Sequence, residues 1–392
     1  MRKKLWFLFL SNLGVWGTVN GLVPLLPVNA GRLGASASVT GLYLALSYLA
    51  MAAGTMIAPW LWRKLGGPQQ MLASSSLLAA VAFVLMGQAT NIPILVALTA
   101  AAWTACGLLT TTLSMVLAAL ADPAQRGRSF GWMALAVPAG ALAGGLAFGV
   151  LIKQGGFAFM FGALGISWLA LPWIGSKVAS GLHQSPQPQH EQIDLPAEGS
   201  LPVAFYLILA TIWLLSLAVF IGRLGTTFAM QALSFAPEQI ARAAGLGGLI
   251  ALPVIPLLGV LSDRAGRRGL VSLCCMVGAS GLLLLARATA QWEFALASGL
   301  MSIATYAGTP LMLALAVDLL PPSMRNWGLS WCTTAIWLAG ILGFALAGRL
   351  LDSWGAGPLA TGAAVLALLT SLLPLIATIR RWIVKPVEAT TV

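Results

Sequence analysis

Polar and aromatic side chains recur inside several long apolar segments of the sequence. They form four sets: Asn12, Trp16 and Asn20; Trp103, Thr110 and Ser114; Trp213, Ser216 and Arg223; and Ser302, Thr305, Tyr306 and Thr309. In the first and last sets, intervals of three and four residues place the side chains on one helix face. Amide, hydroxyl and indole groups can line a cavity for a small molecule through hydrogen bonds and stacking. Ordinary helix packing is the alternative, because such groups also bond between membrane helices, for about 0.6 kcal/mol.

The charged residues of these segments are few. Arg223 alone is well inside an apolar segment, where a central arginine costs at least about 2.5 to 3.5 kcal/mol. It either binds substrate or gates the path, or it anchors a helix end by reaching the interface. The acids near the segments stand at segment ends, and they are Asp122, Glu238, Glu293, Asp318 and Asp352. If the chain moves a solute in exchange for protons, a titratable group must lie in the path. The acids at the segment ends then predict weak or absent proton coupling, with Asp318 and Asp352 as the candidates to bind the proton.

Composition identifies the solvent of this chain. Of its 392 residues, 59% are apolar and 8% charged, and the mean hydropathy is +0.91. A soluble protein carries about 25% charged residues, so lipid must surround this one. The apolar runs are continuous rather than alternating, which excludes an outer-membrane barrel. The sequence therefore predicts an all-α membrane protein with twelve spans of roughly 20 residues each: 5–30, 38–62, 70–89, 93–120, 130–152, 157–176, 203–230, 237–261, 269–289, 293–319, 327–349 and 357–379.

The net charge of +11 is spread in short clusters between the apolar runs, unlike the basic patch of a nucleic-acid binder. We expect a small-molecule substrate and the lipid bilayer as partners, no nucleic acid, and a monomer. The four cysteines fall in apolar segments without metal-ligand spacing, so neither a metal nor a cofactor is expected: Cys106, Cys274, Cys275 and Cys332.

One long polar connection divides the chain. Residues 177–202 are rich in Pro and Gln and cannot bury enough apolar surface to fold. They form a linker between a first six-helix bundle, residues 1–176, and a second, residues 203–392. Fifteen of the 21 Lys and Arg fall on the side of the N-terminus, which predicts that both termini and the linker are cytoplasmic.

The two bundles also repeat each other at an offset of 200 residues. The matched pairs fall at equivalent places in the span pattern: Gly66 and Gly266, Gly140 and Gly340, Gly155 and Gly355, and Gly162-Ala163 and Gly362-Ala363. Because each bundle has an even number of spans, the repeats are parallel, an architecture that one class of transporters uses.

A short loop between the eighth and ninth spans carries the most specific motif. Its residues are Gly259, Asp263, Arg264, Gly266, Arg267 and Arg268. The loop resembles the G-x-x-x-D-R-x-G-R-R loop of the major facilitator superfamily. The glycines permit a tight reversal, and the resemblance implies that Asp263 helps to close the cytoplasmic side, near Ser129 and Phe130. In the first-half counterpart, Arg63 occupies the position of the acid.

Two further strings resemble the drug:proton antiporter, or multidrug efflux, branch of the same superfamily. Residues 24–36 are similar to P-x-x-P followed by L-G-x-S, and Gly131, Gly140 and Gly144 reproduce the spacing G-x8-G-x3-G in the fifth span. Gly145 stands where the branch has proline. The resemblance implies proton exchange and a cavity lined by spans 1, 4, 7 and 10, the spans that carry the four polar sets.

The sequence thus predicts a secondary active or facilitative transporter of the inner membrane that exports a small apolar or amphiphilic compound by alternating access. Uptake or efflux of an uncharged sugar-like metabolite is one alternative, and a non-transporting membrane receptor or scaffold is another. Neither a nucleotide-binding loop nor a set of catalytic residues is apparent, so we do not expect an enzyme.

Overall fold

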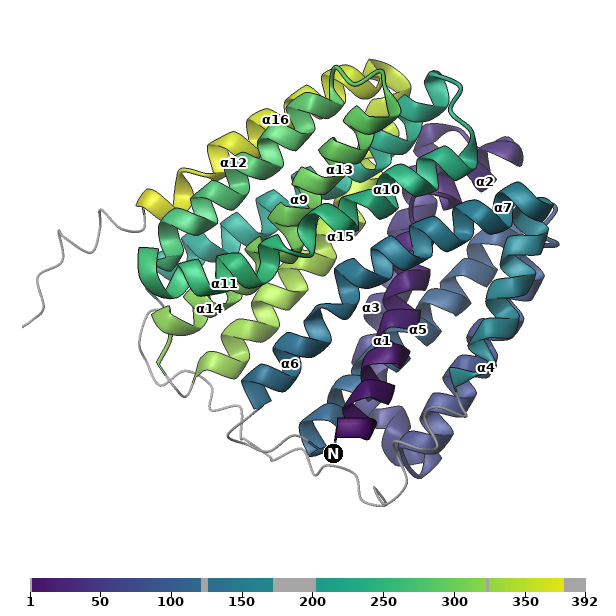
Figure 1. Cartoon of the computed structure of the whole chain (residues 1–392), viewed down its shortest axis with the longest axis horizontal. Coiled ribbons are helices and arrows are strands. Elements are labelled where there is room, and N and C mark those ends of the chain that lie inside the picture. The colour runs from purple at the N-terminus through teal and green to yellow at the C-terminus, as the bar shows by residue number, and fades with distance from the viewer. Residues whose placement is uncertain (1, 121–125, 172–201, 322–323, 377–392) are drawn as a thin grey trace, which may run out of the picture.

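The structure is a computed structural model that describes residues 2–120, 126–171, 202–321 and 324–376. Within those residues the chain folds into helices joined by short turns, without a strand (Figure 1). The predicted all-α membrane fold is confirmed. The first half of the chain contains α1 (Arg2–Leu22), α2 (Leu26–Arg32), α3 (Ala37–Leu65), α4 (Pro68–Met86), α5 (Ile92–Leu120), α6 (Arg126–Ala134) and α7 (Ala136–Trp168). The second half contains α9 (Val203–Ala232), α10 (Pro237–Ala251), α11 (Val254–Ala265), α12 (Arg267–Leu285), α13 (Gln291–Tyr306), α14 (Gly308–Leu319), α15 (Arg325–Trp354) and α16 (Ala356–Thr370).

Ten helical stretches of the described residues are long and apolar enough to cross a membrane, or eleven if α1 and α2, bent by 45°, form one span. The stretch Ser129–Trp168 counts once there, yet it contains a break at Gly155 and Gly156, where Gly156 has a φ of +71°. A left-handed backbone of this kind favours glycine. If the chain reverses at this break, the number of spans is twelve.

Contacts with α1 show that reversal directly. Gly17 approaches Gly140, and Gly21, one turn further along α1, approaches Phe148, so the first part of α7 runs parallel to α1. After the break the indole Nε1 of Trp168 donates to the hydroxyl of Thr18 at 2.9 Å. Leu171, three residues later, lies beside Gly14, one turn earlier in α1. The second part of α7 is therefore antiparallel to α1 and is a separate span.

The side chains on the outside of the bundle are those of a lipid-facing surface. Met56 is 80% exposed and Ile166 is 69% exposed. Soluble proteins rarely expose apolar side chains over so many helices. The interior is packed with large side chains such as Trp62, Phe83 and Trp168, which are at most 2% exposed.

The helices pack in two groups that follow the halves of the chain. In the first half, α1 packs against α7 and α5, and α4 packs against α5 and α7; in the second half, α9 packs against α15 and α16, and α12 against α13 and α16. Two extensive contacts join the halves, α3 with α15 and α7 with α10. These two contacts pair the second span of one half with the fifth span of the other, as two parallel repeats require.

One repeated turn has a glycine with a positive φ in both halves. Gly66, which ends α3, and Gly266, between α11 and α12, share a φ of +84°. Their ψ angles differ, 16° at Gly66 and 141° at Gly266, so the matched glycines share the positive φ that glycine permits but not the whole turn.

Candidate functional site

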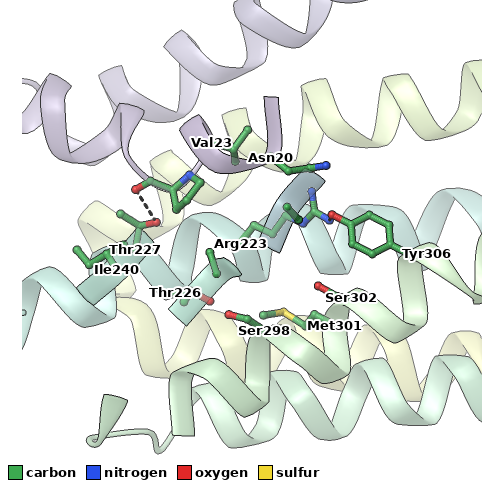
Figure 2. Close-up of a pocket in the computed structure, with 13 residues that line it drawn as sticks. Asn20, Val23, Arg223, Thr226, Thr227, Ile240, Ser298, Met301, Ser302 and Tyr306 are labelled. Atoms are coloured by element: carbon green, nitrogen blue, oxygen red, sulfur yellow. Dashed lines mark hydrogen bonds between the residues drawn. The ribbon is translucent and has the colours of Figure 1, made fainter. Parts of the chain in front are cut away.

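A pocket lies between the two halves (Figure 2). The first half contributes Asn20, Val23, Pro24 and Ala141; α9, α10 and α13 contribute the rest: Arg223, Thr226, Thr227, Ile240, Ala244, Ser298, Met301, Ser302 and Tyr306. The empty space that these residues enclose is about 570 Å³, including the open mouth. The lining combines apolar side chains with a few polar groups from both halves, as small-molecule sites do.

Arg223 extends into this pocket from α9. It lies nine residues before the end of the helix at Ala232, about 13 Å at 1.5 Å per residue, which is deep for a side chain that anchors an interface. Its Nη2 donates to the hydroxyl of Tyr306 at 3.3 Å. The guanidinium carbon is 5.5 Å from the ring centre of Phe220 and 5.7 Å from that of Tyr306. Aromatic faces attract the cation but do not neutralise it.

The opposite wall of the pocket comes from the break between α1 and α2. The Nδ2 atom of Asn20 is buried and has no hydrogen-bond partner among the described residues. The carbonyl of Pro24, which the break removes from the helix ladder, accepts a bond from the hydroxyl of Thr227 at 3.3 Å. Broken membrane helices place such backbone groups where they line cavities. The break therefore joins the halves, and Asn20, in the last turn of α1 before it, places an amide donor at the pocket.

The side of the bundle where α1 begins is called here the N-terminal side, and the opposite side the far side. On the far side the halves touch through glycines. A Cβ atom on Gly41 of α3 would lie 2.4 Å from the carbonyl of Phe344, and one on Gly145 of α7 would lie 2.6 Å from the Cα of Gly245. Small residues permit this approach of membrane helices. The pocket is therefore closed off on the far side by tight backbone contact.

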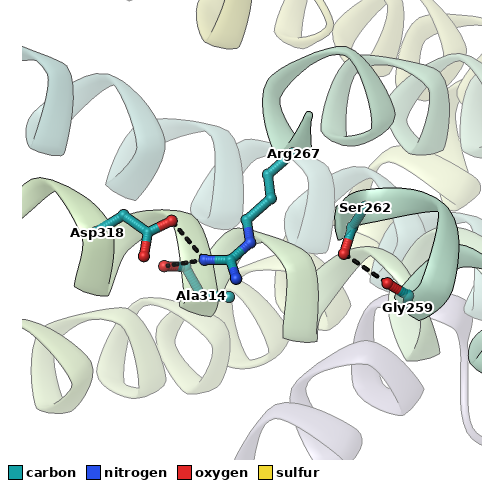
Figure 3. A network of polar contacts seen from close by, with 5 residues as sticks. All are labelled: Gly259, Ser262, Arg267, Ala314 and Asp318. Carbon is teal, nitrogen blue, oxygen red and sulfur yellow. Dashed lines mark hydrogen bonds and ion pairs between the residues drawn. The ribbon is translucent and has the colours of Figure 1, made fainter. Parts of the chain in front are cut away.

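On the N-terminal side the helices pack within their own halves. α6 contacts α1, α5 and α7, whereas α11 contacts α10, α12 and α13. Here Arg267 forms an ion pair with Asp318 and donates to the carbonyl of Ala314 (Figure 3). Arg267 belongs to the loop Gly259 to Arg268, in which the Ser262 hydroxyl bonds the carbonyl of Gly259 at 2.7 Å. Asp263 stands in the last turn of α11, and its side chain lies outside the described residues.

The structure brings together part of the predicted cavity set. Asn20, Arg223, Ser302 and Tyr306 line the pocket. The other members of the set do not line it: Asn12, Trp16, Trp103, Thr110, Ser114, Trp213, Ser216, Thr305 and Thr309.

Several members outside the pocket have other contacts. The side-chain amide of Asn12 donates to the carbonyl of Met133 at 3.1 Å, joining α1 to α6. Trp103 is fully buried. Thr110 and Ser114 bond carbonyls of their own helix, as does Thr305.

The pocket also contains polar residues that sequence reasoning missed: Thr226, Thr227 and Ser298. Ser298 stands four residues before Ser302 and extends the same helix face, so the spacing could have identified it. Thr226 and Thr227 are three and four residues beyond Arg223, an equally regular signal. No spacing signal identifies Ile240 and Ala244, because apolar residues that line a pocket look the same in a sequence as apolar residues that face lipid.

The glycine motif of the fifth span has two distinct surroundings. Gly140 and Gly144 lie against the backbone of Gly17 in α1, where added Cβ atoms would come within 2.6 Å and 2.0 Å. Among the described residues, no atom outside its own helix backbone lies within 4 Å of the Cβ position of Gly131. Two of the three glycines thus allow α1 and α7 to touch.

Twelve helical spans in two repeated halves, with a pocket where the halves meet, define a multi-pass membrane transporter. A family model described as Major Facilitator Superfamily matches residues 5–232 and 206–390, and the chain belongs to this superfamily. Proteins of this family are transporters rather than enzymes.

Solved structures with the same fold include the POT family transporter PepTSo, with a TM-score of 0.75 at 12% identity over 98% of this chain and 99% of that one. A bacterial homologue of the human lysosomal transporter Spinster, described as inward-facing and unoccupied, has a TM-score of 0.68 at 14% identity, over 97% and 96% of the two chains. A peptide transporter POT in complex with sulfate has a TM-score of 0.75 at 13% identity, over 96% and 94%. These similarities show the fold. The sequence matches no curated protein.

Proposed function

We propose that the chain is a secondary active or facilitative transporter that exports a small amphiphilic compound by alternating access. The observation that carries the proposal is the pocket between the halves, lined by Asn20 from one half and by Arg223 and Tyr306 from the other. A site shared by two bodies changes its access when those bodies rock against each other. A receptor or scaffold would not need it.

The described arrangement corresponds to one state of this cycle. Extensive contact on the far side, and packing of α6 and α11 within their own halves on the N-terminal side, favour a state that opens toward the N-terminal side. The excess of Lys and Arg on the N-terminal side supports a cytoplasmic location for it. The state is then inward-open, in a multi-pass protein of the plasma (inner) membrane with both termini cytoplasmic. The loop containing Asp263 contributes to closing that side in the opposite state.

The pocket lining favours an amphiphile over a sugar. Val23, Ala141, Ile240, Ala244 and Met301 present apolar groups. Asn20 and Tyr306 lie beside Arg223, whereas the hydroxyls of Thr226, Thr227 and Ser298 are spread along the rest of the pocket (Figure 2). A sugar needs hydrogen-bond partners on most of its edges, because each unpaired hydroxyl would be buried at a cost. The motifs similar to the multidrug efflux branch support export.

The test is transport by the purified protein in liposomes. A panel of amphiphilic compounds and sugars is offered with and without a pH gradient, and flux is compared with empty liposomes. Saturable flux of amphiphiles supports the proposal. Flux of sugars alone would favour the sugar-like alternative, and no flux of any compound would favour a receptor or scaffold.

A further inference from the structure

We infer that the pocket binds an amphiphilic organic monoanion, such as a medium-chain carboxylate, through its anionic headgroup at Arg223. This inference rests on the proposed function, because it takes the pocket to be the substrate site. It specifies the charge of the substrate, which the proposed function leaves open.

The first argument is the missing counter-charge of Arg223. Among the described residues the guanidinium bonds to neutral groups, the Tyr306 hydroxyl above all, and forms no ion pair. The acids whose side chains are described act elsewhere: Asp318 pairs with Arg267, Glu293 bonds the backbone before α13, and Asp352 bonds the start of α3. Glu238, in the first turn of α10, does not line the pocket. An uncompensated charge inside a membrane protein is costly, and an anionic ligand would compensate it.

The second argument is the set of donors beside Arg223. Nδ2 of Asn20 is buried with no acceptor among the described residues. Figure 2 shows Asn20, Arg223 and Tyr306 gathered at one end of the pocket. A carboxylate has two oxygens and accepts several hydrogen bonds at once, including a bidentate pair from arginine. One headgroup can therefore satisfy donors from both halves.

The third argument is the character of the remaining wall. Away from these donors the wall combines the apolar groups of Ile240, Ala244 and Met301 with the hydroxyls of Thr226 and Ser298, and none of these residues carries a charge. Among the described residues, no carboxylate lines it to attract a cationic drug. An apolar tail is expected on that side, which gives an amphiphile with one negative charge at its end.

Binding to the purified protein in lipid nanodiscs tests the headgroup without requiring transport. Octanoate, octanamide and octylamine share one tail and differ in charge, and acetate keeps the charge without the tail. We expect octanoate to bind at least tenfold more tightly than each of the other three by isothermal titration calorimetry. Equal binding of octanoate and octanamide, or tighter binding of octylamine, would overturn the inference with the unmodified protein alone.

Variants then assign the preference to Arg223. Arg223→Gln should bind octanoate no better than octanamide, while octanamide affinity stays at the unmodified value and shows that the pocket is folded. The matched control is Arg242→Gln, which removes an exposed arginine of α10 outside the pocket and should keep the full preference. A preference that survives in Arg223→Gln would contradict the assignment.

The two proposals fail in different ways. Tight octanoate binding with no octanoate flux in liposomes would refute transport and leave the anion site intact. Flux of octanamide, with no preference for octanoate in binding or flux, would leave transport intact and refute the anion site.

Discussion

Asp352, at the end of α15 in the second half, caps the beginning of α3 in the first half. Its carboxylate accepts bonds from the backbone N–H of Ala37 at 3.2 Å and of Ser38 at 2.9 Å, and from the Ser38 hydroxyl. The hydroxyl of Ser36 serves the next amide, that of Val39. The first amides of α3 thus donate hydrogen bonds to side chains from both halves. The bonds to Asp352 can form only while the halves are in contact on the far side.

We expect Asp352→Asn to weaken far-side closure. Asp352 is exposed, and a carboxylate at an exposed helix N-terminus contributes about 0.3 to 1 kcal/mol, so the ratio of the two states should change by up to about fivefold. Distances between spin labels on α3 and α15 at the far side measure this ratio. The control is Glu293→Gln, because Glu293 bonds the amides of Thr289 and Ala290 within its own half. Unchanged distances in Asp352→Asn would contradict the role of this cap.

Glycines between the halves should act on the same equilibrium. Gly41→Ala and Gly145→Ala place a Cβ 2.4 Å from the Phe344 carbonyl and 2.6 Å from the Gly245 Cα, which the backbone cannot accommodate without separation. Overpacking of this kind costs about 1 to 3 kcal/mol, so both variants should favour the state open on the far side. The same spin-label distances report it. Gly362→Ala in α16, with no atom within 4 Å, should behave like the unmodified protein; an equal shift there would argue against the steric explanation.

Glycines within one half should instead affect folding. Gly144→Ala would bring a Cβ to 2.0 Å from the carbonyl of Gly17, so we expect a loss of about 1 to 3 kcal/mol of stability. Thermal unfolding followed by tryptophan fluorescence measures this loss. Gly131→Ala has free space at its Cβ position and should be neutral or stabilising, since alanine favours a helix by about 1 kcal/mol over glycine. Equal melting temperatures for the two variants would show that the contact with α1 is not needed.

Cysteine labelling should separate pocket residues from packed ones. Asn20→Cys and Tyr306→Cys should react with a water-soluble thiol reagent, because both positions line the pocket. Trp103→Cys should stay unlabelled, since Trp103 is fully buried. The native cysteines are also buried, which keeps the background low. Rapid labelling at position 103, or none at positions 20 and 306, would require a different cavity.

Transport should be largely indifferent to a pH gradient. The two candidate proton carriers are both engaged outside the pocket, Asp318 with Arg267 and Asp352 with Ser38. A coupled proton needs a site that changes its access together with the substrate. Flux into proteoliposomes with and without an imposed gradient measures the coupling. Uphill accumulation driven by the gradient, and lost in Asp318→Asn but not in Glu293→Gln, would show that proton exchange operates after all.

The apolar spans and the stripes of polar residues could be predicted from local patterns in the sequence. A continuous apolar run that is long enough to cross a bilayer must form a helix, because lipid offers the backbone no hydrogen bonds. The gap between the runs 130–152 and 157–176 also predicted the break at Gly155 and Gly156. Helical periodicity likewise fixed which side chains share a face, as in the stripe from Ser302 to Thr309. These features are local, so a local pattern can carry them.

Only the tertiary structure decided which stripe faces the pocket. Asn12 and Asn20 share one face of α1, yet Asn12 bonds the carbonyl of Met133 and Asn20 lines the pocket. The rotation and depth of each helix depend on its contacts with the others, such as those of Gly17 with Gly140 and Gly144. This packing places Arg223 beside Tyr306. It also brings Asp352 to the start of a helix more than 300 residues away in the sequence. The spacing of residues within one helix does not predict this packing, because the stabilising contacts form between helices that are distant in the sequence.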